Sequence, residues 1–155
     1  MSSPNMTLKD LTEARFQYDL ARHPNVPEHG RYRKVYTDKT ANGLTTAILD
    51  FCTIQGIMCQ RTGSEGRFRN GATVVDVIGR TRQMKGMWLP GHNVGQGDLQ
   101  IVLKGRIYSI EVKIGRDTQS EVQKEFQSRL ERAGGIYVIV KSWSDFYYKF
   151  KTWVK

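Results

Sequence analysis

Apolar and polar side chains alternate with a period of two along residues 98–112, on both sides of Lys104-Gly105. Such alternation is typical of a half-buried β-hairpin, and a glycine in the turn readily takes the positive φ that other residues avoid. The pattern predicts two antiparallel strands joined by a two-residue turn. In that register Asp98 pairs with Glu111, and Lys113 lies on the same face as Glu111 because side chains alternate.

Apolar side chains at helical spacing predict four helices, and short apolar runs between turn residues predict further strands. The order of these elements predicts an α/β fold in which helices flank a mixed sheet. A chain of 155 residues with 39% hydrophobic side chains is long enough for one domain with a proper core. We expect an N-terminal arm outside the core over residues 1–36 and one domain over residues 37–155. The helices are expected over 8–23, 37–55, 119–133 and 143–153, and the strands over 57–61, 73–78, 83–89 and 136–140.

The charge of the chain changes this picture. A formal net charge of +9 favours a polyanionic partner, most commonly nucleic acid, although charge alone also fits an ordinary basic protein. The basic side chains concentrate in a glycine-bearing insertion at about residues 62–90, where we expect a hairpin that follows phosphates; a solvated loop is the alternative. The candidate DNA-binding residues are Arg61, Arg67, Arg69, Arg80, Arg82 and Lys85.

Three large apolar side chains lie near the end of this insertion, namely Met84, Met87 and Trp88. We expect them to pack in the core, with base stacking as the alternative. His92 lies in the loop that leads to Asp98, and a structural or solvent-facing role is expected for it.

Cysteine usage and hydropathy point to the setting of the protein. Cys52 and Cys59 suit neither a disulfide scaffold nor a zinc site. No apolar run has the length of a membrane span, and the N-terminus lacks the apolar region of a signal peptide. We therefore expect a reduced, cytoplasmic setting and no membrane partner.

Two carboxylates that face each other across a hairpin repel, and a divalent cation would compensate for this repulsion. Mg²⁺ commonly takes one or two carboxylates together with waters and phosphate oxygens, which makes Asp98 and Glu111 candidate metal ligands. Lys113 would then polarise a water molecule or stabilise charge on a phosphate. The alternative is a solvated strand end that carries three unrelated charges.

The spacing of these residues resembles that of a known nuclease superfamily. Asp98 followed by Glu111-Val112-Lys113 resembles the D…(D/E)-x-K signature of PD-(D/E)XK nucleases. Gln123 on the next expected helix, and Ala133-Gly134-Gly135 before the last expected strand, resemble the VRR-Nuc branch of that superfamily. The resemblance covers roughly residues 39–146.

The resemblance implies a restriction-endonuclease-like core that hydrolyses phosphodiester bonds in DNA with Mg²⁺ or Mn²⁺. It implies that Asp98 and Glu111, with the carbonyl of Val112, hold the metal. It also implies that the Gln123 amide orients the attacking water or a phosphate oxygen. In VRR-Nuc proteins the first core helix often carries a glutamate near its start; here Asn42 is the nearest polar residue and is the accessory candidate.

Small stand-alone VRR-Nuc proteins resemble structure-selective endonucleases, including phage resolvases of branched DNA such as Holliday junctions. The resemblance therefore implies a branched DNA substrate, in the cytoplasm of a bacterial or phage-infected cell, and a homodimer where paired cuts are made. Two alternatives stay open. One is a catalytically inactive nucleic-acid-binding module of the same fold, which the missing helix acid favours. The other is a sequence-specific restriction-type nuclease, which usually needs more chain.

Overall fold

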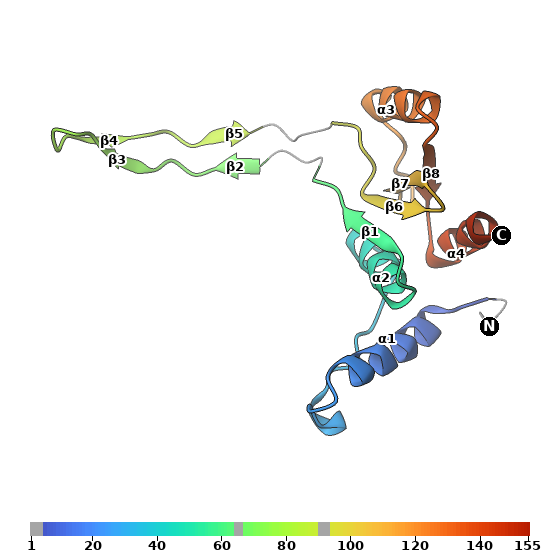
Figure 1. The fold of residues 1–155 in the computed structure, drawn as a ribbon. Coiled ribbons are helices and arrows are strands. Elements are labelled where there is room, and N and C mark those ends of the chain that lie inside the picture. Colours follow the sequence, from blue (N-terminus) through green and yellow to red (C-terminus); the bar gives the residue numbers. More distant parts are fainter. Residues whose placement is uncertain (1–4, 64–66, 90–93) are drawn as a thin grey trace.

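The computed structural model describes residues 5–63, 67–89 and 94–155. Figure 1 shows a four-stranded sheet with helices on both sides and a long two-stranded ribbon that extends away from it. The sheet has the strand order β1-β6-β7-β8, with β7 and β8 parallel and the other neighbours antiparallel. The predicted mixed sheet flanked by helices is thereby confirmed. These strands are β1 (Met58–Arg61), β6 (Leu99–Leu103), β7 (Arg106–Val112) and β8 (Ile136–Val140).

The β6–β7 hairpin has the predicted register. Lys104 and Gly105 both have positive φ, 50° and 73°, which is the backbone of a type I′ turn. Leu99 pairs with Ile110 across the strands, and both side chains are fully buried. One face of β6 therefore packs into the core, while the alternate side chains, Gln100 and Val102, face toward solvent.

The helices α2 (Ala41–Ile54) and α4 (Trp143–Val154) cover one face of the sheet (Figure 1). The apolar stripe predicted for α2 is buried there, and the ring of Phe51 meets four aromatic rings of α4 edge-on, with centroids 4.9 to 5.9 Å apart. α2 begins later than the expected residue 37, because the hydroxyl of Thr40 accepts a hydrogen bond from the backbone N–H of Gly43 and caps the helix.

The N-terminal helix α1 (Leu8–Arg22) packs against α2. A capping box between Thr7 and Asp10 begins the helix, and Leu11 is fully buried within the main core cluster. The expectation of an arm outside the core is therefore wrong for this helix, because its apolar side chains leave water by packing on α2. A short 3-10 helix, η1 (Glu28–Gly30), follows.

The opposite face of the sheet carries α3 (Glu121–Arg132) (Figure 1). Ser120 caps this helix, so it begins two residues later than the expected Gln119. Its Phe126 ring meets the ring of Tyr137 on β8, with centroids 6.3 Å apart. Within the described residues, none of the helices has an apolar stretch of the length that crossing a bilayer requires.

The expected basic insertion forms the ribbon, which we define as residues 67–89. Its two ladders share one continuous register, in which Phe68 pairs with Trp88 and Val74 pairs with Arg82. The strands are β2 (Arg67–Arg69), β3 (Thr73–Val75), β4 (Thr81–Gln83) and β5 (Met87–Leu89), with β2 paired to β5 and β3 to β4.

The turn at the tip of the ribbon ends β3 earlier than the expected residue 78. The carboxylate of Asp76 accepts hydrogen bonds from the backbone N–H groups of Ile78 and Arg80, at 3.0 and 2.8 Å. An aspartate that holds its own turn in this way favours chain reversal over continued pairing.

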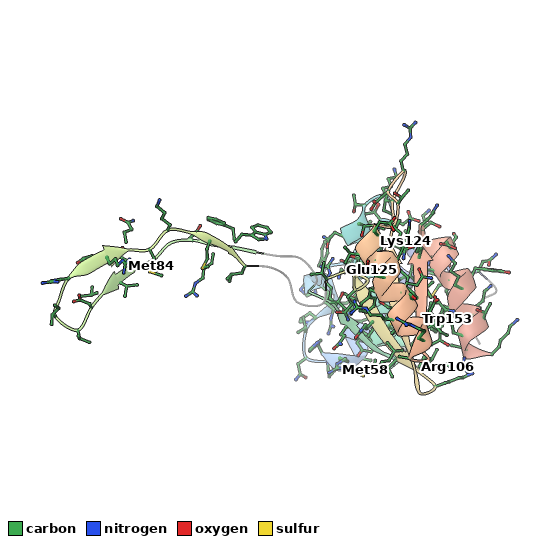
Figure 2. The ribbon with its side chains drawn as sticks, turned by 90° about the horizontal axis from the view of Figure 1, so that it is seen from above. Met58, Met84, Arg106, Lys124, Glu125 and Trp153 are labelled. Atoms are coloured by element: carbon green, nitrogen blue, oxygen red, sulfur yellow. The ribbon has the colours of Figure 1, made fainter. Side chains whose placement is uncertain are left out.

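The ribbon corrects the prediction that Met84, Met87 and Trp88 pack in the core. All three are more than half exposed, because the described residues form no second layer over this part of the ribbon. Figure 2 shows the ribbon, with Met84 labelled on it, standing away from the rest of the protein. His92 lies outside the described residues.

Candidate active site

Gly97 sets the start of β6 against β7. A Cβ atom at this position would lie 2.6 Å from the carbonyl oxygen of Ile110 and 2.8 Å from Oγ of Ser109. The backbone N–H of Gly97 also donates a 3.2 Å hydrogen bond to that Oγ. Only glycine fits this close approach, and it brings the next residue, Asp98, to the open end of the hairpin.

Asp98 is held on both its backbone and its side chain. Its Oδ2 accepts a 2.8 Å hydrogen bond from the N–H of Val112, and its carbonyl oxygen accepts a 3.0 Å hydrogen bond from the N–H of Thr62. The first contact sets Asp98 beside the end of β7, although the paired register ends with Leu99 opposite Ile110, so the pairing of Asp98 with Glu111 stays a prediction. The side chain is half-buried, and its Oδ1 accepts no hydrogen bond from the part of the chain that the structure describes.

Glu111 is the centre of the site. Its side chain is only 6% exposed, and three donors surround the carboxylate. Oε1 accepts from the amide of Gln123 at 2.6 Å and from Nζ of Lys113 at 2.9 Å, and Oε2 accepts from the hydroxyl of Tyr137 at 3.3 Å. Burial raises the pKa of Glu111, and the charge of Asp98 raises it further; Lys113 and Gln123 oppose this rise without cancelling it.

Lys113 follows two residues along β7, on the same face as Glu111. It is 7% exposed, and its ammonium group lies 2.9 Å from Glu111 and 3.3 Å from Asp117. Burial by itself lowers the pKa of Lys113, but the hydrogen bonds and charges of these two carboxylates outweigh burial, so the pKa is raised. Lys113 is therefore a cation throughout the neutral range.

Both the oxygen and the nitrogen of the Gln123 side-chain amide form hydrogen bonds. Its oxygen accepts a 3.0 Å hydrogen bond from the N–H of Ser120, which is one half of a capping box at the start of α3. Its nitrogen donates the 2.6 Å hydrogen bond to Glu111. We expected this amide to orient a water molecule or a phosphate oxygen, whereas here it orients the carboxylate of Glu111.

Tyr137 is a member of the site that sequence reasoning missed. β8 runs parallel to β7 with Tyr137 opposite Ser109, so the tyrosine shares the face on which Glu111 lies. Burial and the negative charge of Glu111 raise the pKa of Tyr137, which makes the hydroxyl a neutral hydrogen-bond donor. The available signal was a single polar-tipped side chain within an otherwise aliphatic strand, over residues 136–140.

A cavity of about 490 Å³ opens beside Asp98, between α2 and the end of β1. Asn42, Arg61 and Thr62 line it together with Asp98. Arg61 donates a 2.6 Å hydrogen bond from Nη2 to Oδ1 of Asn42. The structure thus brings the accessory candidate Asn42 to the edge of the site, and it places one of the candidate DNA-binding arginines there as well.

The other basic candidates lie along the ribbon, away from Glu111. The side chains of Arg69, Arg80, Arg82 and Lys85 are exposed, and none of them forms an ion pair with any of the described residues. Arg67 belongs to β2, and its side chain lies outside what the structure describes. The candidate basic residues are therefore divided between the site and a projecting surface.

The oxygen atoms at the open end of the hairpin suit a hard divalent cation. Residues 5–63, 67–89 and 94–155 contain no group of three or more His, Cys, Asp or Glu side chains that would hold a metal ion. Mg²⁺ needs fewer protein ligands, since one or two carboxylates with waters are its usual set. The carbonyl of Val112 faces the same edge as its N–H, which bonds to Asp98. Asp98, Glu111 and this carbonyl are the residues that fit.

Comparison with known proteins assigns the chain to no family. The chain matches no protein-family model, and no curated protein matches it at a significant level.

Proposed function

We propose that this protein is a metal-dependent DNA endonuclease of the PD-(D/E)XK type, with the VRR-Nuc branch as its nearest pattern. The observation that carries the proposal is the buried carboxylate of Glu111, held by Lys113 and Gln123 on the face where Asp98 lies. Structural ion pairs rarely bury an acid beside a second acid, because both burial and like charge raise the pKa of the acid. Such a cost is typical of functional sites.

Asp98 and Glu111, with the carbonyl of Val112, would hold Mg²⁺ or Mn²⁺. When bound, such an ion activates water and neutralises charge on the reacting phosphate. Lys113 acts as a fixed cation beside the phosphate, because its raised pKa excludes the role of a general base at neutral pH. Gln123 and Tyr137 hold the two oxygens of Glu111 in place, which preserves the geometry of the site.

The substrate we propose is DNA, with branched DNA as the class that the resemblance implies. The ribbon supports a polyanionic partner, since its cations have no acidic partners among the described residues and the whole chain carries a net charge of +9. A homodimer would supply two sites for paired cuts in a junction. Activity in the cytoplasm of a bacterial or phage-infected cell follows from the same resemblance.

A second candidate function is a nucleic-acid-binding module without catalysis. The observation in its favour is that α2 offers Asn42 where the VRR-Nuc pattern often has a glutamate, and that this asparagine is already bonded to Arg61. In this alternative the ribbon and Arg61 bind DNA, and Asp98 and Glu111 have no catalytic role.

Incubation of the purified protein with labelled linear and branched DNAs, in Mg²⁺, in Mn²⁺ and in chelator, tests the two candidates. We expect cleavage with either metal and none in chelator. Glu111→Gln should abolish cleavage and leave DNA binding within about twofold, whereas the matched variant Glu125→Gln, at an exposed position of α3, should cut normally. Binding without cleavage in every metal would favour the second candidate.

A further inference from the structure

Phe68 and Trp88 form an exposed aromatic pair on the ribbon. They face each other directly in the β2–β5 ladder, and their side chains are 60% and 63% exposed. Neither ring contacts another aromatic ring in the described residues. Most of the surface of both rings is therefore open to a partner.

The ribbon packs one of these rings against its own backbone, since a Cβ at Gly86 would lie 2.5 Å from Cζ of Phe68, but neither ring belongs to the core cluster. The ribbon consists of two successive two-stranded ladders, over which the described residues form no second layer (Figure 2), and a two-stranded ribbon of this kind has little stability of its own. Exposed apolar side chains that gather on one segment mark an interaction surface. Six more large apolar side chains of the ribbon are exposed, namely Val74, Val75, Val77, Ile78, Met84 and Met87.

The positive charge of the ribbon indicates which kind of partner it binds. Arg69 adjoins Phe68 in the chain, and Lys85 and Arg82 precede Trp88 by three and six residues. Asp76 is the only acidic residue between positions 67 and 89, and its carboxylate holds the turn. A second copy of the ribbon would bring like charges together, whereas a nucleic acid meets both the cations and the rings.

The position of the pair connects it with the candidate active site. Arg61, the last residue of β1, pairs with Leu99, and the N–H of Thr62 bonds to the carbonyl of Asp98. The ribbon thus leaves the sheet at the end where Asp98 lies. β2 and β5 form the ladder closer to the sheet, and β3 and β4 form the farther one (Figure 1).

We propose that Phe68 and Trp88 form a stacking platform for unpaired bases, so that the ribbon recognises DNA with a single-stranded segment and leads it to the site at Asp98. The inference rests on the proposed function and specifies its substrate class. Bases in an intact duplex are stacked on one another and offer these rings no face, whereas unpaired bases stack on aromatic side chains in a way that tolerates any sequence.

Tryptophan fluorescence in chelator tests this platform without any cleavage. Trp88 is exposed, whereas Trp143 is buried in the core and Trp153 packs against it. We expect an oligo(dT) single strand to quench the emission of Trp88 at concentrations where a duplex of equal length quenches it little. Trp88→Phe should remove the quenching and keep most of the affinity, since a phenyl ring still stacks.

Trp88→Ala should weaken single-strand binding by about 5- to 100-fold and duplex binding by no more than about twofold. Its salt dependence should match that of the parent, because no phosphate contact is lost. Tyr148→Ala is the matched control, since Tyr148 is 69% exposed on α4 and lies outside the ribbon. Far-UV circular dichroism checks that each variant is folded.

Three results would overturn the platform. Equal losses for single strand and duplex in Trp88→Ala would make Trp88 a general contact. Concentration-dependent association of the parent that Trp88→Ala abolishes, with unchanged DNA affinity, would assign the rings to a second copy. Quenching by anionic vesicles but not by oligo(dT) would assign them to a membrane. Single-strand binding with these properties, in a protein that cuts no DNA, would instead overturn the nuclease and keep the platform.

Discussion

The amide nitrogen of Gln123 lies 2.6 Å from Oε1 of Glu111 and donates a hydrogen bond to it, while the amide oxygen accepts from the N–H of Ser120. One side chain therefore serves both the start of α3 and the orientation of the buried acid. An amide that is fixed at both ends has a single orientation, so a change at the cap of this helix reaches the site directly.

Gln123→Ala should change the pKa of Glu111 as well as the stability of α3. Loss of the side-chain half of the capping box should lower the free energy of unfolding by about 1 kcal/mol, while the backbone N–H at position 123 still bonds to Ser120. Loss of the hydrogen bond should raise the pKa of Glu111 further, because that bond favours the carboxylate. The acidic limb of the pH–rate profile should therefore move to higher pH. Gln127→Ala, whose amide contacts Gln119 and Glu131, is the control; a profile identical in both variants would contradict this role.

Lys113→Met should lower cleavage by orders of magnitude and leave DNA binding largely intact. It should also lower the free energy of unfolding at neutral pH by about 3–5 kcal/mol, because it leaves Glu111 buried without its cation. The raised pKa of Glu111 means that the folded protein holds a proton more tightly than the unfolded chain. The deficit should therefore shrink as pH falls toward and below the ordinary value of 4.5.

Chemical denaturation of this variant at pH 5 and at pH 8 measures the difference. Lys124→Met is the matched control, since Lys124 is an exposed lysine of α3 (Figure 2) whose one ion pair among the described residues is with Glu121. A deficit of the same size at both pH values would show that Glu111 is not the group left without a partner.

Asp98→Asn should stabilise the protein in chelator, by about 0.2–1 kcal/mol, because it removes the like charge beside Glu111. The asparagine oxygen can still accept from the N–H of Val112. The parent has a raised pKa at Glu111 and should lose stability as pH rises from 4.5 through that pKa, and the variant should lose less.

Added Mn²⁺ should stabilise the parent and have little effect on Asp98→Asn, because a ligand stabilises only the folded state that binds it. Melting curves of both proteins, in chelator and in Mn²⁺, give the answer. Lower stability of Asp98→Asn in chelator would contradict the opposed acids, and an equal Mn²⁺ response in both proteins would place the metal elsewhere.

Gly97→Ala should damage the site through the backbone. The added methyl group would lie 2.6 Å from the carbonyl oxygen of Ile110, so the start of β6 must move. We expect a loss of about 1–3 kcal/mol in the free energy of unfolding and a weaker response to Mn²⁺. Gly30→Ala, where a Cβ meets nothing within 4 Å, is the control. Equal melting temperatures of the two variants would show that the close approach of Gly97 to Ile110 does not affect stability.

Arg69→Ala combined with Arg82→Ala should weaken binding to all DNA sequences alike. The slope of log K against log salt should flatten by about 0.9 for each duplex phosphate contact that is lost. Titrations at several salt concentrations measure this slope, with Arg132→Ala on α3 as the control. An unchanged slope would show that Arg69 and Arg82 contact no phosphate.

The β6–β7 hairpin, the four helices and the order of the elements outside the ribbon followed from the sequence alone, whereas the expected strand over residues 83–89 is wrong, because β4 ends at Gln83 and β5 begins at Met87. Alternation on both sides of a two-residue turn at Lys104-Gly105 fixes the register, so the pairing of Leu99 with Ile110 is set by local chemistry. The capping box of Thr7 and Asp10 likewise marks the start of α1, whereas α2 and α3 begin later than expected, after the caps Thr40 and Ser120. These features depend on neighbours in the chain, which the sequence displays.

Only the tertiary structure decided which side chains contact Glu111 and whether Trp88 is buried or exposed. Tyr137 reaches Glu111 because β8 pairs in parallel with β7, a contact between residues 26 positions apart that no local pattern encodes. Leu11 enters the core only because α1 docks on α2. Trp88 is apolar in sequence, as a core residue is, but burial needs a second layer, and the ribbon has none.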